Sequence, residues 1–109
     1  IAQVAKLFSD IAIVRIVSTI SPFIESRLKA KNIIGQRYVE VYVKANMDTC
    51  TKRDPKGLYK RVSVGSINNF TGVDSPYEEP ESPDYIIDTE QWGEEECIEN
   101  LVNIILDLQ

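Results

Sequence analysis

The residues of this 109-residue sequence that could do chemistry are largely charged, and the two signs of charge occupy different parts of the chain. Residues 1–61 hold all 12 Lys and Arg and five acidic residues, so this part carries +7. Residues 62–109 hold 12 acidic residues and no Lys or Arg, so this part carries −12. A basic segment predicts an anionic ligand, such as a nucleotide or an ester of sulfate or phosphate. The alternative is that the two parts pack together and partly neutralise each other.

Composition excludes several kinds of function. The sequence has no His, which removes most acid–base triads, the usual zinc sites and histidine pH switches. Two cysteines, Cys50 and Cys97, are too few for a disulfide framework and favour a reducing compartment. No apolar run approaches the ~20 residues of a membrane helix, and the N-terminus does not resemble a signal peptide. We therefore expect one cytoplasmic domain that binds neither a membrane nor nucleic acid.

The elements that must position these residues alternate along the chain. Apolar spacing, β-branched runs and turn formers predict helices near 1–8, 22–31, 47–53, 57–62 and from 94 onward, strands at 11–17, 38–43 and 85–87, and a loop over 66–84. This order predicts an α/β fold, with a parallel sheet flanked by helices. Three strands make a small sheet and residue 1 already lies in a helical pattern, so we expect an N-terminal half of the domain to be missing.

Two longer motifs carry a family resemblance. Arg53–Lys60 (RDPKGLYK), followed by 69–78 (NFTGVDSPYE), strongly resembles adenylyl-sulfate kinases, which transfer the γ-phosphate of ATP to the 3′-hydroxyl of adenylyl sulfate. The turn at 20–23 (ISPF) and the strand at 38–43 lie in the expected order, and the resemblance covers essentially all of 1–109. It implies the C-terminal portion of a P-loop NTPase domain, with its P-loop half missing and a lid at about 53–71. It also implies a homodimer or other self-association.

The resemblance implies roles for individual residues on the acceptor side. Lys56 reaches the anionic groups of adenylyl sulfate, and Phe70 stacks on its adenine beside Asn69. The other substrate-binding residues that it implies are Ile20, Ser21 and Arg27. Ser21 is implied as the catalytic residue through a phosphoserine, although direct in-line transfer needs none. Ser21 ahead of Pro22 also fits a simple helix cap.

On the ATP side, the resemblance implies nucleotide contacts from Arg53 and from the region of Trp92. These residue types suit phosphoryl transfer, in which the protein chiefly positions the groups and neutralises charge. A basic lid can close over phosphates and exclude water. An aromatic face can hold a purine by stacking, worth about 1–3 kcal/mol per base.

The phosphate-binding loop of the family is absent from these residues. A P-loop reads Gly-x-x-x-x-Gly-Lys-Ser/Thr, and none of the five glycines here is followed by Lys. The resemblance implies ATP and Mg²⁺ as cofactors of the parent enzyme, but no magnesium ligand is identifiable, so we expect the isolated chain to be inactive.

Two alternatives to the enzyme remain open. One is a non-catalytic, nucleotide-sensing kinase-like domain, such as that fused to fungal ATP sulfurylase. Two departures from the family agree with this sensor. Lys44 stands where the family commonly has Asp, and 62–64 (VSV) lacks a lid arginine. The other is a remnant that self-associates through unpaired strand edges.

Overall fold

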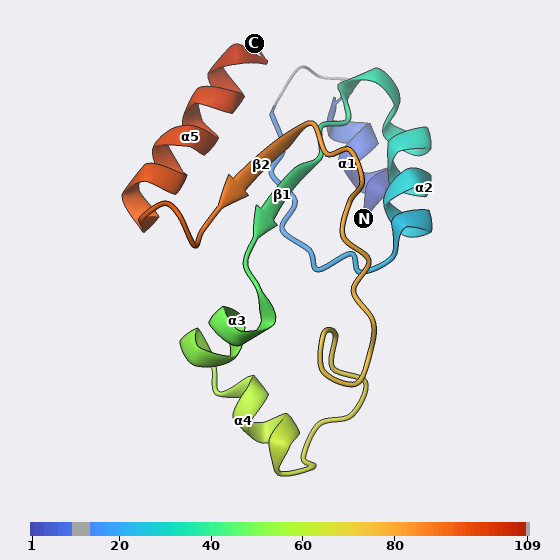
Figure 1. Ribbon diagram of the computed structural model, residues 1–109. Helices are drawn as coiled ribbons and strands as arrows, with labels where there is room; N and C mark the ends of the chain where they lie inside the picture. Colours follow the sequence, from blue (N-terminus) through green and yellow to red (C-terminus); the bar gives the residue numbers. More distant parts are fainter. Residues whose placement is uncertain (10–13, 109) are drawn as a thin grey trace.

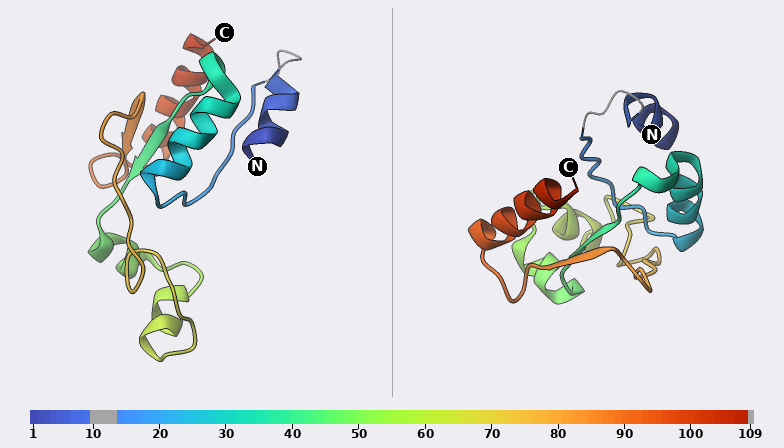
Figure 2. Two further views of the ribbon diagram at one scale, coloured as in Figure 1. Left: turned by 90° about the vertical axis from the view of Figure 1, so that its right-hand side faces the viewer. Right: turned by 90° about the horizontal axis from the view of Figure 1, so that it is seen from above.

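The structure, a computed structural model, describes residues 1–9 and 14–108 and places a small parallel sheet between helices (Figure 1). The helices are α1 (Ala2–Ser9), α2 (Ile24–Ile34), α3 (Met47–Arg53), α4 (Leu58–Ser63) and α5 (Glu94–Asp107), with a 3₁₀ turn at Gly35–Arg37. The strands are β1 (Val41–Lys44) and β2 (Tyr85–Asp88). Helix α5 lies on one side of the sheet, with α1 and α2 on the other (Figure 2). The predicted α/β class is confirmed.

The sheet joins segments that lie far apart in the sequence. Strands β1 and β2 pair in parallel, with Val41 opposite Tyr85 and Lys44 opposite Asp88. Parallel strands need a long crossover connection, and here α3, α4 and the irregular segment 64–84 provide it. The pairing brings the carboxyl ends of both strands to the side of the sheet where α3 begins.

The helix predictions hold better than the strand predictions. The predicted helices at 1–8, 47–53, 57–62 and from 94 are confirmed. The predicted strand at 11–17 is wrong over 14–17, which belong to no strand, while 11–13 lie outside the described residues. The physical reason is that a strand requires a hydrogen-bonded neighbour, and among the described residues β1 pairs only with β2. The strand predicted at 38–43 is shorter at its start, because β1 begins at Val41.

The sheet and its helices enclose little apolar core. Among the described residues, the buried apolar side chain is that of Ile87, which is 4% exposed. The apolar face predicted for α5 is only partly covered, since Ile98 and Val102 are 54% and 47% exposed. Part of the apolar surface lines a large cavity instead of packing against itself. Within the described ranges, no helix combines the length and apolar character needed to cross a membrane.

The crossover forms a helical lobe that extends away from the sheet (Figure 1). The Asn46 side chain caps α3 by accepting from the Thr49 N–H at 2.8 Å. The Asp54 carboxylate accepts from the N–H groups of Tyr59 and Lys60, each at 3.2 Å, at the start of α4. These polar caps explain why two short helices form here, since short helices depend on satisfying their end groups.

The lobe and the following loop meet at Gly72, which gives a test of the fold. Gly72 has a φ of +87°, and a Cβ added there would lie 2.5 Å from Met47 Sδ. We expect Gly72→Ala to lower the free energy of unfolding by about 1–2 kcal/mol, because an L side chain is strained at this φ. Urea unfolding followed by circular dichroism measures this loss.

Gly93→Ser is the control, because Gly93 has a φ of −68° and open space around its Cβ position, and because it is the N-cap of α5, where Ser is favoured. It should change the free energy of unfolding by no more than about 0.5 kcal/mol. Equal losses from the two substitutions would contradict the positive φ described for Gly72.

Candidate functional site

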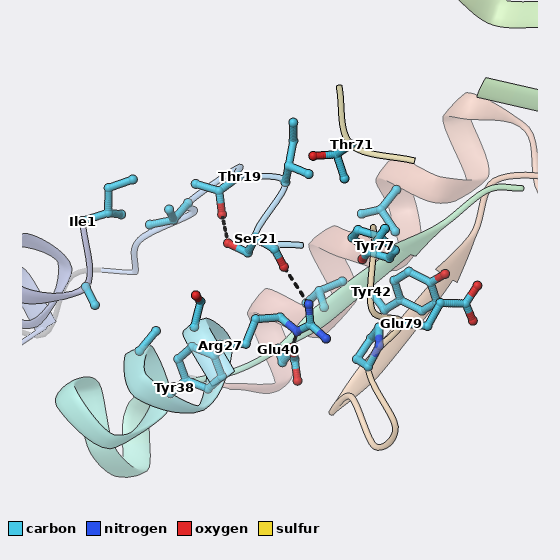
Figure 3. Close-up of a pocket in the computed structure, with 18 of the residues that line it drawn as sticks. Ile1, Thr19, Ser21, Arg27, Tyr38, Glu40, Tyr42, Thr71, Tyr77 and Glu79 are labelled. Carbon is cyan, nitrogen blue, oxygen red and sulfur yellow. Dashed lines mark hydrogen bonds and ion pairs between the residues drawn. The ribbon is translucent and has the colours of Figure 1, made fainter. Parts of the chain in front are cut away.

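One cavity of about 1920 Å³ gathers residues from distant parts of the chain (Figure 3). Four of the residues singled out from the sequence line it: Ile20, Ser21, Arg27 and Phe70. Ligand pockets usually measure roughly 300–1,000 Å³. The cavity therefore has room for a nucleotide, and its lining includes residues of α2, β1, the extended segment before α2 and the loop at 70–80.

The turn that carries Ser21 has an unusual backbone. Ser21 has a φ of +40°, which non-glycine residues rarely adopt. Its hydroxyl lies 2.6 Å from Thr19 Oγ1, and its carbonyl accepts from Arg27 Nη1 at 2.6 Å. Strained backbone of this kind persists only where neighbouring groups hold it in place.

The prediction that Ser21 caps the helix is wrong. Helix α2 begins at Ile24, and its N-cap residue, Phe23, makes no side-chain capping bond. The Glu78 carboxylate instead accepts from the Ile24 N–H at 2.7 Å. Because a distant carboxylate supplies this contact, the Ser21 hydroxyl is not needed by the helix end.

Phe70 is held in a tight turn. The Asp74 carboxylate accepts from the Asn69 N–H at 2.8 Å and also from the Phe70 N–H. The Phe70 carbonyl accepts from the N–H groups of the three residues at 73–75. The Phe70 ring and the Tyr59 ring of α4 meet edge to face, with centroids 4.9 Å apart and planes at 76°. The lid-like lobe thus fixes the orientation of this half-buried ring.

The remaining predicted residues lie outside the lining of the cavity, which does not include Lys56, Asn69, Arg53 or Trp92. Lys56 is exposed in the turn between α3 and α4. Arg53 donates to Thr89 Oγ1 at 2.8 Å and to the Thr89 carbonyl at 2.6 Å. The Trp92 N–H donates to the Asp88 carbonyl at 3.0 Å. Arg53 and Trp92 therefore share the carboxyl end of β2, apart from the Ser21 turn.

That carboxyl end joins the basic and acidic parts of the chain. Lys44 Nζ lies 3.3 Å from Asp88 Oδ2 across the strand pair. The pKa of Asp88 is lowered, first by the hydrogen bond from the Glu90 N–H and further by Lys44. The Glu90 carboxylate accepts from Asn46 Nδ2 at 2.5 Å and Thr49 Oγ1 at 2.6 Å. Part of the charge asymmetry is thus neutralised inside the molecule, as the alternative interpretation predicts.

Sequence reasoning missed two tyrosines of the cavity wall. The Tyr42 and Tyr77 rings stack with centroids 6.5 Å apart and planes at 21°. Burial, followed by the Glu79 carboxylate, raises the pKa of Tyr42 to about 12. Burial also raises the pKa of Tyr77. Both phenols stay protonated at neutral pH and present O–H donors. Tyr77 stood inside the second motif, but only the fold reveals that it meets Tyr42.

Two further residues that sequence reasoning missed are acidic. Glu40 pairs with Arg27, with Oε1 2.9 Å from Nε, and Glu78 contacts the start of α2. Glu78 ends the second motif, but nothing in the sequence identifies its partners. Across the described parts of the chain, no three His, Cys, Asp or Glu side chains group closely enough to hold a metal ion.

Known proteins resemble this chain closely. The family model for adenylylsulphate kinase matches residues 1–88. The adenylyl-sulfate kinase of Clostridium acetobutylicum is 47% identical over 105 residues, which are 96% of this chain and 52% of that protein. The probable adenylyl-sulfate kinase of Halalkalibacterium halodurans is 49% identical over 102 residues, which are 93% of this chain and 50% of that protein. The chain thus spans about half the length of the curated relatives that it matches.

A solved structure agrees with the sequence comparisons. The APS kinase of Mycobacterium tuberculosis, solved in complex with AMPPNP and APS, superposes with a TM-score of 0.80 at 34% identity. The match covers 98% of this chain and 61% of that one. The fold is accordingly that of a P-loop NTPase, with helices flanking a parallel sheet. By sequence and by structure, the chain belongs to the adenylylsulphate kinase family.

Proposed function

We propose that this chain supplies the acceptor side of an adenylyl-sulfate kinase, which transfers the γ-phosphate of ATP to the 3′-hydroxyl of adenylyl sulfate. The observation that carries the proposal is the meeting of Ile20, Ser21 and Phe70 in one cavity. The family resemblance assigns these three residues to the acceptor nucleotide. They come from segments some fifty positions apart, so their meeting is not a consequence of sequence proximity.

In this proposal the Phe70 face stacks on the adenine, and the Ser21 turn contacts the rest of the acceptor. Lys56 reaches the anionic groups when the lobe at about 53–71 closes as a lid. Arg53 and the region of Trp92 contact ATP at the carboxyl end of β2. Closure would exclude water from the phosphates, which strengthens every charge interaction there.

ATP and Mg²⁺ are the proposed co-substrate and cofactor of the whole enzyme. These 109 residues contain no Gly-x-x-x-x-Gly-Lys-Ser/Thr sequence, and the described ones offer no metal-binding cluster. The residues present therefore do not fit a magnesium site, and no step of the reaction is assigned to the metal here. Both cysteines are free thiols, which supports the proposed cytoplasmic location.

The first prediction from the proposed function concerns turnover. We expect the 109-residue chain, incubated with ATP, Mg²⁺ and adenylyl sulfate, to form no 3′-phosphoadenylyl sulfate above background, because its sequence has no P-loop to bind the phosphates of ATP. Chromatography of the nucleotides measures the product. Robust product formation would contradict the assignment of the chain to the acceptor side alone.

A second prediction concerns the base-stacking ring. Phe70→Ala should weaken the binding of adenylyl sulfate by roughly 5- to 150-fold, the equivalent of about 1–3 kcal/mol of stacking. Titration calorimetry measures the affinity. Phe8→Ala is the matched control, because it removes the same side chain at a position that is 47% exposed and outside this cavity. Equal affinities for Phe70→Ala and the unsubstituted chain would refute the role of Phe70.

The same titration distinguishes the sensor alternative. An acceptor site binds adenylyl sulfate, whereas a non-catalytic sensor of the kind fused to ATP sulfurylase should prefer 3′-phosphoadenylyl sulfate. A clear preference for the second ligand would replace the enzyme proposal with the sensor.

A third prediction concerns association. We propose that the chain self-associates, because side chains such as Ile16 and Val43 are 68% and 62% exposed and β1 has one unpaired edge among the described residues. Sedimentation velocity should show an apparent mass that rises with concentration. Val43→Lys should reduce this rise, while Lys31→Ala, an exposed polar position, should not. A monomer at all concentrations would contradict self-association.

A further inference from the structure

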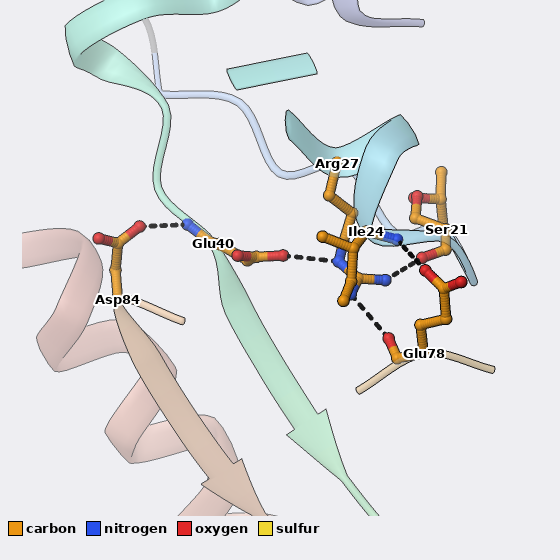
Figure 4. A network of polar contacts seen from close by, with 7 residues as sticks. Ser21, Ile24, Arg27, Glu40, Glu78 and Asp84 are labelled. Atoms are coloured by element: carbon orange, nitrogen blue, oxygen red, sulfur yellow. Dashed lines mark hydrogen bonds and ion pairs between the residues drawn. The ribbon is translucent and has the colours of Figure 1, made fainter. Parts of the chain in front are cut away.

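Glu78 joins the loop after Phe70 to the turn that carries Ser21 (Figure 4). Its carboxylate accepts from the Ile24 N–H at 2.7 Å, and its N–H donates to the Pro22 carbonyl at 2.8 Å. Its carbonyl accepts from Arg27 Nη2 at 2.7 Å. Side chain and backbone of one residue thus contact three consecutive parts of the segment 22–27.

Arg27 reaches the same turn from α2. Besides the Glu78 carbonyl, its guanidinium donates to the Ser21 carbonyl at 2.6 Å and lies 2.9 Å from Glu40 Oε1. The guanidinium carbon also stands 6.0 Å from the centre of the Tyr77 ring. The Arg27 side chain is only 11% exposed. Each of the three guanidinium nitrogens therefore faces a protein oxygen, in directions that only the planar arginine head can match.

The contacts explain how a costly backbone conformation is maintained. Ser21 has a φ of +40°, and its carbonyl must point at Arg27 to accept the bond. Glu40, the residue before β1, compensates the buried charge of Arg27. The loop that carries Glu78 is also held in place, since it follows the hydrogen-bonded turn at 70–75.

We propose that Arg27 is a positioning residue that binds no substrate itself, and that with Glu78 it holds the Ser21 turn and the loop 74–80 as one unit. This fixes the position of the Ser21 turn, onto which the lid that carries the Phe70 ring closes. The functional consequence rests on the proposed function, whereas the coupling of the two segments does not. This positioning role replaces the substrate contact that the family resemblance implies for Arg27.

The coupling is tested without any ligand, by hydrogen exchange of the full chain. Arg27→Ala and Glu78→Ala should each speed amide exchange at least about tenfold in both 18–24 and 74–80, while β1 and β2 keep their protection. Glu78→Gln should restore slow exchange, because its amide oxygen still accepts from the Ile24 N–H. The matched control is Lys31→Ala, which removes an exposed charge from the same helix. Faster exchange confined to the substituted segment, or spread equally over the sheet, would overturn the proposal.

Calorimetry with adenylyl sulfate at salt concentrations from about 0.05 to 0.5 M separates positioning from direct contact. A positioning role predicts that Arg27→Ala weakens binding about tenfold with the salt dependence unchanged, and that Arg27→Lys is equally weak, because an ammonium cannot span the three partners. A reduced salt dependence, with affinity rescued by Arg27→Lys, would show that Arg27 contacts the anion and would overturn the assignment. If the unsubstituted chain does not bind adenylyl sulfate, the proposed function fails, and the exchange experiment still decides the coupling.

Discussion

A single guanidinium connects three parts of this chain that the sequence keeps apart. Arg27 of α2 donates to the Ser21 carbonyl before the helix, pairs with Glu40 just before β1, and donates to the Glu78 carbonyl in the loop before β2. A cation that is 11% exposed requires such partners, because an uncompensated buried charge is strongly destabilising. The position of the Ser21 turn relative to the sheet and loop therefore depends on this residue.

The rest of the molecule needs such connections because its apolar packing is sparse. Ile87 is buried at the strand pairing, while Ile98 of α5 and Val43 of β1 remain more than half exposed. Directed polar contacts therefore do much to fix how the elements lie relative to one another. The same openness leaves the cavity in which Ser21 and Phe70 meet.

Polar contacts also organise the opposite end of the sheet. Arg53 reaches Thr89 from α3, and the Glu90 carboxylate accepts from Asn46 and Thr49 at the start of that helix. The helical lobe is thus attached to the loop after β2 at its base, while its tip extends away from the sheet (Figure 1). A lobe fixed at one end is suited to the closing motion that the family resemblance implies.

Local rules let the sequence determine several features by itself. The helices at Met47–Arg53 and Glu94–Asp107 follow from spacing and end residues, and the two motifs indicated the family. Tertiary structure alone decided that 14–17 is not a strand and that Ser21 does not cap α2. It also decided that Arg27 is occupied by protein groups. Strand pairing, ion pairs and long-range hydrogen bonds join residues 13 to 54 positions apart. A local sequence pattern does not specify which distant residues become these partners.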